Sequence, residues 1–135
     1  MNQGIFKAYD VRGKYPEELN EETAFKIAAA MAKHFGKRAK VVVGRDGRSS
    51  SPSLYKAVLR GLQHSNVLKN VRMSVIDAGI MTTPMLYFLV NKLKADGGIM
   101  VTASHNPKEY NGLKVVGKNA RPISGKEILK LVIGK

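Results

Sequence analysis

Three short apolar runs, each followed by turn-forming residues, constrain the fold of this chain more than any other feature. They are "KVVVGRD" (40–46), "VRMSVIDAG" (71–79) and "GGIMVT" (97–102). Runs of this length, rich in valine, isoleucine and methionine, are typical of buried strands. A stretch with apolar residues at helical spacing precedes each run: "NEETAFKIAAAMAKHFG" (20–36), "SSPSLYKAVLRGLQ" (50–63) and "TTPMLYFLVNKL" (82–93). Strands that alternate with helices predict an α/β fold with a mainly parallel sheet.

A fourth strand-like run, "NGLKVVG" (111–117), has a different kind of connection. Only about ten residues separate it from the run before it, and a parallel crossover needs a dozen or more. We therefore expect a wide hairpin that makes the last strand antiparallel to the third. A last helix is predicted in "SGKEILKLVIGK" (124–135). Residues 1–135 are thus expected to form one domain, a three-layer α/β/α sandwich with a four-stranded mixed sheet.

The composition is that of a folded globular protein. The chain has 135 residues, of which 44% are hydrophobic, and this fits one domain. No run reaches the roughly 18 apolar residues of a membrane span. The stretch "MNQGIFKAYD" (1–10) lacks the basic and apolar regions of a signal peptide. A cytoplasmic protein with no membrane partner is therefore expected.

The net charge of +13 is unevenly distributed. Residues 1–36 contain five basic and five acidic residues, whereas residues 37–135 contain 18 basic and five acidic residues. Three interpretations fit this excess: binding to nucleic acid, binding to small phosphate esters, or the loss of an acidic partner surface. The basic residues are scattered rather than grouped in blocks, which disfavours a nucleic-acid tail.

Four loops carry the polar residues that could perform chemistry. Three follow predicted strands and are expected at one edge of the sheet, where open α/β sheets bind ligands. Their hydroxyls, arginines and glycines form a composition suited to phosphate. The loops are "YDVRGKYP" (9–16), "GRDGRSSS" (44–51), "DAGIMTTP" (77–84) and "TASHNPKEYNG" (102–112).

Ser104 has two interpretations from the residues alone. It could be a loop serine that hydrogen-bonds its own backbone. It could instead be a nucleophile or phosphate carrier, because Pro107 stiffens the loop and because His105 and Lys108 place positive charge nearby.

The neighbouring candidates are equally open. Lys114 could lie on the solvent face of an edge strand, or the hairpin could bring it near Ser104 to hold phosphate or move a proton. Arg12 could be a surface arginine or a phosphate ligand. His105 alone is more often a surface or loop-bracing histidine than a base. Asp46 beside two arginines is interpreted as a structural ion-pair network.

Taken together, the motifs resemble the first domain of the α-D-phosphohexomutases. The resemblance rests on "FKAYDVRG" (6–13), "GRDGRSSS" (44–51), "DAGIMTTPMLYF" (77–88) and "GGIMVTASHNPKEYNGLKV" (97–115). It extends from Phe6 to about Gly125 and is greatest to the phosphomannomutase/phosphoglucomutase branch. T-A-S-H-N-P followed by Y-N-G-x-K is a highly specific signature.

The resemblance implies an isomerase activity and roles for five residues. Ser104 would carry a phosphate that interconverts hexose 1-phosphate and hexose 6-phosphate through a bound hexose 1,6-bisphosphate. Mg²⁺ would bridge that phosphate, which makes Ser104 the metal contact of this chain. Lys114 would transfer a proton or contact phosphate. Tyr9 and Arg12 would face the reacting phosphate or sugar, and His105 would assist.

The resemblance also implies that residues 1–135 correspond to the phosphoserine-bearing first domain of a four-domain enzyme. The D-G-D-x-D-R metal loop and the R-x-S-G-T phosphate clamp are absent from this sequence. The other metal ligands and the remaining domains are thus expected partners, and the isolated domain is expected to be inactive. The expected substrate is a mannose or glucose phosphate.

Three alternatives stay open at this point. They are a phosphoglucosamine mutase domain, a non-catalytic module that binds sugar phosphates, and a nucleic-acid binder. The sparse aromatic residues of the loops disfavour the nucleic-acid binder.

Overall fold

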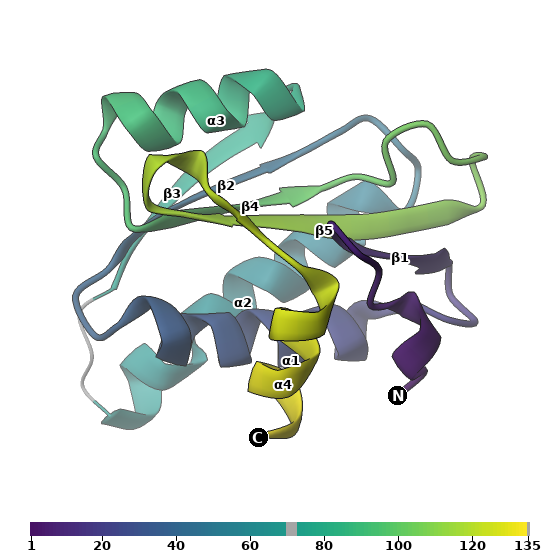
Figure 1. Cartoon of the computed structure of the whole chain (residues 1–135), viewed down its shortest axis with the longest axis horizontal. Coiled ribbons are helices and arrows are strands. Elements are labelled where there is room, and N and C mark those ends of the chain that lie inside the picture. Colours follow the sequence, from purple (N-terminus) through teal and green to yellow (C-terminus); the bar gives the residue numbers. More distant parts are fainter. Residues whose placement is uncertain (70–72, 135) are drawn as a thin grey trace.

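The predicted strands lie side by side in one mixed sheet in the computed structural model of the chain, which describes residues 1–69 and 73–134 (Figure 1). The strand order is β1-β5-β4-β2-β3, and β6 pairs with β5. β2 is parallel to β3 and β4, whereas β5 is antiparallel to β4. The strands are β1 (Val11–Lys14), β2 (Lys40–Arg45), β3 (Ser74–Ile80), β4 (Gly97–Val101), β5 (Tyr110–Gly117) and β6 (Pro122–Ile123). The helices are α1 (Glu21–Phe35), α2 (Ser51–Lys69), α3 (Thr83–Lys92) and α4 (Gly125–Ile133), with short 3-10 turns η1 (Gln3–Ile5) and η2 (Lys118–Ala120).

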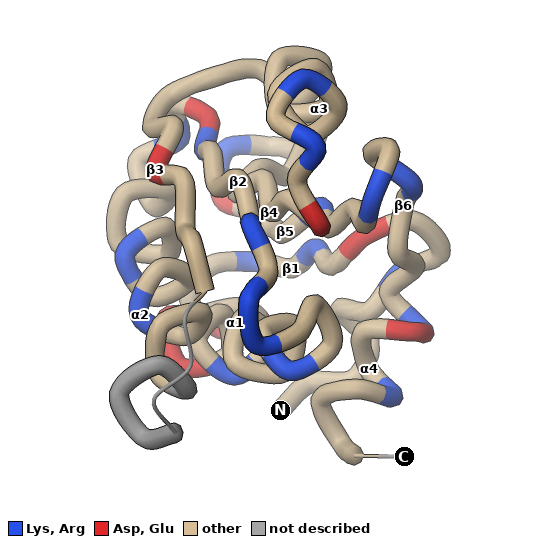
Figure 2. The backbone as a smooth tube through the Cα atoms, turned by 90° about the vertical axis from the view of Figure 1, so that its left-hand side faces the viewer, with Lys and Arg blue, Asp and Glu red and all other residues tan. Residues whose placement is uncertain are grey.

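Helices cover both faces of the sheet, which confirms the α/β/α prediction. Figure 2 views the layers edge-on, with α3 above the sheet and α1, α2 and α4 below it. Val41 and Val43 pack into the larger core on the α1 and α2 side, while Val42 packs into the smaller core under α3. This alternation explains why β2 has an unbroken apolar sequence: both of its faces are buried.

The sheet has six strands rather than the predicted four. β4 pairs with one edge of β5, and the antiparallel β1 and β6 share the other. The predicted antiparallel pairing of the last long strand is confirmed. β3 begins at Ser74, and the first two residues of its predicted range, Val71 and Arg72, lie outside the described residues.

Polar side chains fix the starts of the helices that orient the loops. Asn20 Oδ1 accepts the N–H of Thr23 at the start of α1 (3.0 Å), and Thr82 Oγ1 accepts the N–H of Met85 at the start of α3 (3.3 Å). Such caps satisfy N–H groups that have no partner within the helix. In the described part of the chain, no helix is long and apolar enough to cross a membrane.

Candidate active site

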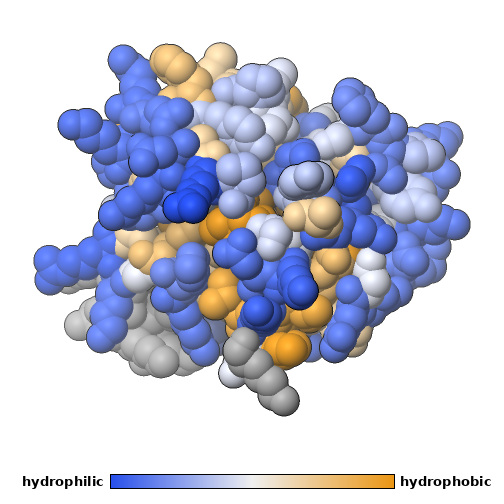
Figure 3. All heavy atoms as spheres, in the orientation of Figure 1, coloured by the Kyte–Doolittle hydropathy of each residue, from blue (hydrophilic) through white to orange (hydrophobic). Residues whose placement is uncertain are grey.

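Loops from several parts of the chain meet beyond the carboxyl ends of β2 and β4, at the right in Figure 1. The N–H of Asp46, after β2, donates to the last carbonyl of β4 (3.0 Å), and the N–H of Met81, after β3, donates to the last carbonyl of β2 (2.9 Å). From β1, Arg12 Nη1 donates to Asn106 Oδ1 in the loop after β4 (2.6 Å). The surface at this end is mostly hydrophilic (Figure 3). These contacts bring the predicted loops to one edge of the sheet.

Ser104 lies exposed in the loop between β4 and β5 with a left-handed backbone, φ 56°. This conformation costs a residue with a side chain about 1–2 kcal/mol. The N–H of Ser104 donates to Thr102 Oγ1 (3.0 Å), which helps to hold the turn. The Ser104 hydroxyl forms no hydrogen bond with any residue that the structure describes. The hydroxyl is therefore free to react, while its backbone is held in place.

A buried carboxylate, Asp10, holds the two predicted cationic residues together. Only 1% of its side chain is exposed, and Oδ1 accepts Arg12 Nε (2.9 Å) while Oδ2 accepts Lys114 Nζ (3.3 Å). The side chains of Arg12 and Lys114 remain 33% and 23% exposed. One carboxylate thus fixes two cations that can still reach an anion in solution. The sequence interpretation missed Asp10, although it directly precedes the short strand that carries Arg12.

Lys114 does not lie on an edge strand, so that interpretation is wrong. β5 has partners on both of its edges. Lys114 pairs with Met100, which packs under α3, so Lys114 lies on the α3 face of the sheet. On α3, burial raises the pKa of Tyr87, and the negative charge of Asp10 raises it further. The phenol therefore faces the cluster in its neutral form.

Two of the predicted residues have no contact with this cluster. Tyr9 is 77% exposed, and His105 is also exposed beside Ser104. Neither side chain forms a hydrogen bond or ion pair within residues 1–69 and 73–134. The structure thus joins Arg12, Lys114 and the Ser104 loop, but leaves Tyr9 and His105 at the surface.

Arg48 has the most contacts of any residue with the loop that carries Ser104, and the sequence interpretation did not place it in the site. Its Nε donates to Asp46 Oδ2 (3.2 Å), which confirms one of the predicted ion pairs. Arg45 instead donates to the Asp46 carbonyl (3.1 Å). The guanidinium of Arg48 also donates to four loop carbonyls, those of Ser104 (3.0 Å), Asn106 (2.7 Å), Pro107 (2.7 Å) and Tyr110 (3.1 Å).

Asp46 is held by a network of polar side chains beneath the loops. Burial raises its pKa, but hydrogen bonds from the hydroxyls of Ser51 and Thr102 and from the N–H of Arg48 lower it by more, so the pKa lies below its usual value. Ser51 Oγ donates to Asp46 Oδ1 (2.6 Å) and accepts from Asn111 Nδ2 (3.0 Å). Ser51 and Asn111 are fully buried. The network connects the start of α2 to both loops.

The described residues offer few ligands for a metal. Among residues 1–69 and 73–134, no three histidine or acidic side chains are grouped as a metal site requires. Asp10 is already paired with Arg12 and Lys114. A phosphate on Ser104 would be the contact that this chain offers to Mg²⁺, as the resemblance implies.

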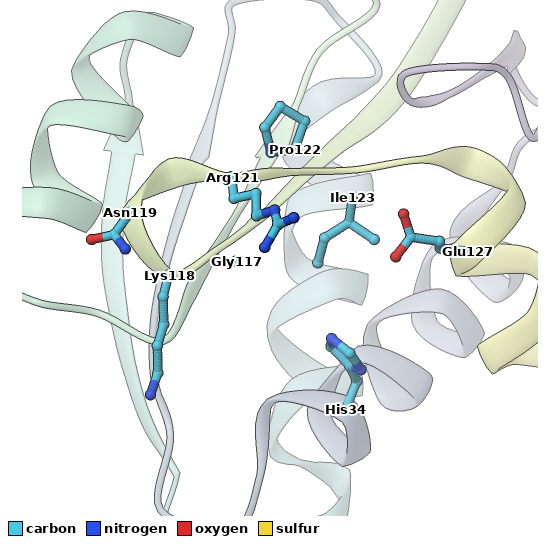
Figure 4. A pocket seen from close by; sticks show the side chains of 8 residues that line it. All are labelled: His34, Gly117, Lys118, Asn119, Arg121, Pro122, Ile123 and Glu127. Carbon is cyan, nitrogen blue, oxygen red and sulfur yellow. The ribbon is translucent and has the colours of Figure 1, made fainter.

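Two pockets show which surface is hollowed near the site. A pocket of about 340 Å³ borders it and is lined by Arg12, Asn106 and Tyr110, among others. A larger pocket of about 510 Å³ lies near α4 (Figure 4), where the side chains of Arg121, His34 and Glu127 converge near Ile123. None of the predicted site residues lines the larger pocket. The smaller one is therefore relevant to the candidate site.

Comparison with known proteins identifies the family. Residues 3–132 match the family "Phosphoglucomutase/phosphomannomutase, alpha/beta/alpha domain I". "Phosphohexose mutases" of Xanthomonas campestris are 49% identical over 124 residues, which cover 92% of this chain and 26% of the relative. A "Phosphomannomutase" of Klebsiella pneumoniae is 49% identical over 120 residues, which cover 89% of this chain and 72% of the relative.

Solved structures agree with the sequence matches. A phosphoglucomutase/phosphomannomutase family protein from Burkholderia thailandensis superposes with a TM-score of 0.84 at 34% identity, covering 99% of this chain and 31% of the other. A structure titled as a phosphomannomutase from Thermus thermophilus gives a TM-score of 0.77 at 30% identity, with 95% and 29% coverage. The chain spans about a quarter of most of the curated relatives that it matches. The chain belongs to the phosphoglucomutase/phosphomannomutase family and corresponds to its α/β/α domain I.

Proposed function

We propose that this chain supplies the phosphoserine of a phosphohexomutase. Ser104 carries a phosphate and transfers it to a hexose phosphate, which forms a hexose 1,6-bisphosphate. The bisphosphate reorients and returns its other phosphate to Ser104, so that hexose 1-phosphate and hexose 6-phosphate interconvert. The names of the relatives, phosphomannomutase among them, support mannose or glucose as the hexose.

The observation that carries the proposal is a free hydroxyl on a fixed backbone, next to a cationic cluster. Phosphoryl transfer depends mainly on positioning and on neutralisation of negative charge. The loop fixes Ser104, and Asp10 fixes the two cations Arg12 and Lys114. Arg12 also donates to Asn106 of the Ser104 loop (2.6 Å), so its guanidinium lies beside the segment that would carry the phosphate.

The residues of this chain divide the work between binding and proton transfer. The Arg12 guanidinium and the Lys114 ammonium stabilise charge on the oxygens of the transferring group. When the P–O bond to Ser104 breaks, the serine oxygen needs a proton. Lys114 Nζ, with three N–H donors, can provide it.

Mg²⁺, when bound to the phosphate, supplies further positive charge. The phosphate on Ser104 would hold the ion from this chain. The remaining ligands would come from outside residues 1–135.

The experiment that tests the proposal measures turnover of hexose phosphate by the protein that contains this chain. Ser104→Ala removes the attacking and leaving oxygen, so turnover should be lost. Ser74→Ala, an exposed serine at the start of β3 on the opposite edge of the sheet, serves as the matched control and should keep the rate of the unmodified protein. Turnover by Ser104→Ala at the rate of the control would refute the assignment. A wild-type protein that binds hexose phosphate but never acquires phosphate would instead support the non-catalytic binding module.

A further inference from the structure

Arg48 uses all of its hydrogen-bonding capacity to organise one loop. A guanidinium has five N–H donors in a fixed planar arrangement. One of them meets Asp46 Oδ2. The other four meet the carbonyls of Ser104, Asn106, Pro107 and Tyr110, residues that follow Arg48 by 56 to 62 positions in the sequence. Only 15% of the side chain is exposed, so these bonds face little competition from water.

The anchor beneath Arg48 is itself rigid. Asp46 accepts hydrogen bonds from the N–H and Nε of Arg48 (3.1 and 3.2 Å) and from the buried Ser51 hydroxyl (2.6 Å). Ser51 is the first residue of α2 and is fixed in turn by Asn111 of β5. The guanidinium is therefore held from the scaffold side before it contacts the loop.

The inward carbonyls determine where the loop N–H groups point. A peptide group is planar and trans, so its N–H points away from its own carbonyl. With the carbonyls of Ser104 and Pro107 turned toward Arg48, the N–H groups of His105 and Lys108 face the opposite side of the loop. Neither N–H donates to an acceptor in the described part of the chain. The loop thus turns unpaired donors outward around a serine whose backbone is left-handed, and outward N–H groups of this kind favour an anion.

We propose that Arg48 is a positioning residue: it holds the Ser104 loop in the conformation that accepts and donates phosphate, without touching the substrate. This inference rests on the proposed function for its catalytic consequence, but not for its structural one. A lysine has one compact charged group that cannot meet five acceptors in a plane. Charge alone therefore does not replace the guanidinium.

The test compares Arg48→Gln and Arg48→Lys with Arg38→Gln. Arg38 is exposed between α1 and β2, at the other end of the sheet, so its replacement makes the same charge change away from the loop. The first readout is the ¹⁵N NMR spectrum of the chain. In both Arg48 variants the amides of residues 103–111 should shift and gain fast motion, while those of β2 and β4 keep their positions. Arg38→Gln should leave residues 103–111 unchanged.

The second readout is phosphoryl transfer in the protein that contains this chain. A misplacement of about 1 Å at a reacting group can cost about 100-fold in rate, so kcat should fall about 100-fold in Arg48→Gln. KM for hexose phosphate should change less than threefold, because Arg48 does not bind it. Arg48→Lys should lose nearly as much as Arg48→Gln.

Three outcomes would overturn the inference. They are an ordered loop in Arg48→Gln, a full rate in Arg48→Lys, or a disordered loop with unchanged kcat. If Arg48→Gln does not fold, as judged by the β2 and β4 amides, Arg48→Lys decides by the same readouts. If the wild-type protein never acquires phosphate on Ser104, the proposed function fails, and the NMR comparison still decides whether Arg48 shapes the loop.

Discussion

Gly112 lies where three segments approach one another too closely for any side chain, and replacing it should cost stability in a calculable way. A Cβ atom at this position would lie 2.2 Å from the Val11 carbonyl oxygen, 2.8 Å from Arg12 Cγ and 2.9 Å from the Thr102 carbonyl oxygen. Two of these atoms belong to the backbone and cannot rotate away. Relief requires a shift of about 1 Å between β5 and its neighbours, since carbon and oxygen make good contact at roughly 3.5 Å or more.

The cost should reach the upper end of the range for overpacking, about 3 kcal/mol for Gly112→Ala. β1 pairs only with β5, so the shift would disturb all of its sheet contacts. A loss of this size should lower the Tm of a domain of this length by roughly 10 °C.

Gly117→Ala is the matched control for this prediction. Gly117 lies in the same strand, has an ordinary φ of −96°, and a Cβ there would have its nearest neighbours at 3.9 Å. Its replacement should change the free energy of unfolding by less than about 0.5 kcal/mol. Urea unfolding of the two variants, followed by circular dichroism, measures the difference. Equal unfolding midpoints would refute the close approach of β1 and the Thr102 carbonyl to Gly112.

Two further predictions concern buried carboxylates. Asp10→Asn removes the charge that holds Arg12 and Lys114, and urea unfolding should show a loss of about 2 kcal/mol; an unchanged midpoint would contradict the cluster. Because the pKa of Asp46 is lowered by folding, its contribution to stability is complete above the usual value of 3.8 and is lost as the pH falls through the lowered pKa. Asp46→Asn should therefore be less stable than wild type at pH 6, with the gap closing by about pH 2; a gap independent of pH would contradict the hydrogen bonds from Ser51.

The long elements of the fold were predictable from the sequence because their apolar patterns are strong. The run 40–46 is buried on both faces, and the short link between 102 and 111 allows only an antiparallel return. β1 and β6 were missed for a physical reason. "VRGK" and "PI" are too short for any periodicity, and they are strands only because β5 offers them a free edge.

The candidate site was predictable only in part, for a related reason. Ser104, Arg12 and Lys114 lie in motifs that can be recognised locally. Arg12 and its acceptor Asn106 are 94 residues apart, and Arg48 meets carbonyls up to 62 residues away. Main-chain acceptors carry no sequence signal, since every residue has a carbonyl. The partners of Arg48 therefore become visible only in the folded structure.

The central claim is that Ser104 carries the transferable phosphate. The most direct measurement incubates the protein that contains this chain with a hexose 1,6-bisphosphate and Mg²⁺, and then maps phosphate on its peptides by mass spectrometry. The account predicts one phosphate, on Ser104, that is lost when hexose phosphate is added. A protein that stays unmodified, or that carries its phosphate on another residue, would contradict it.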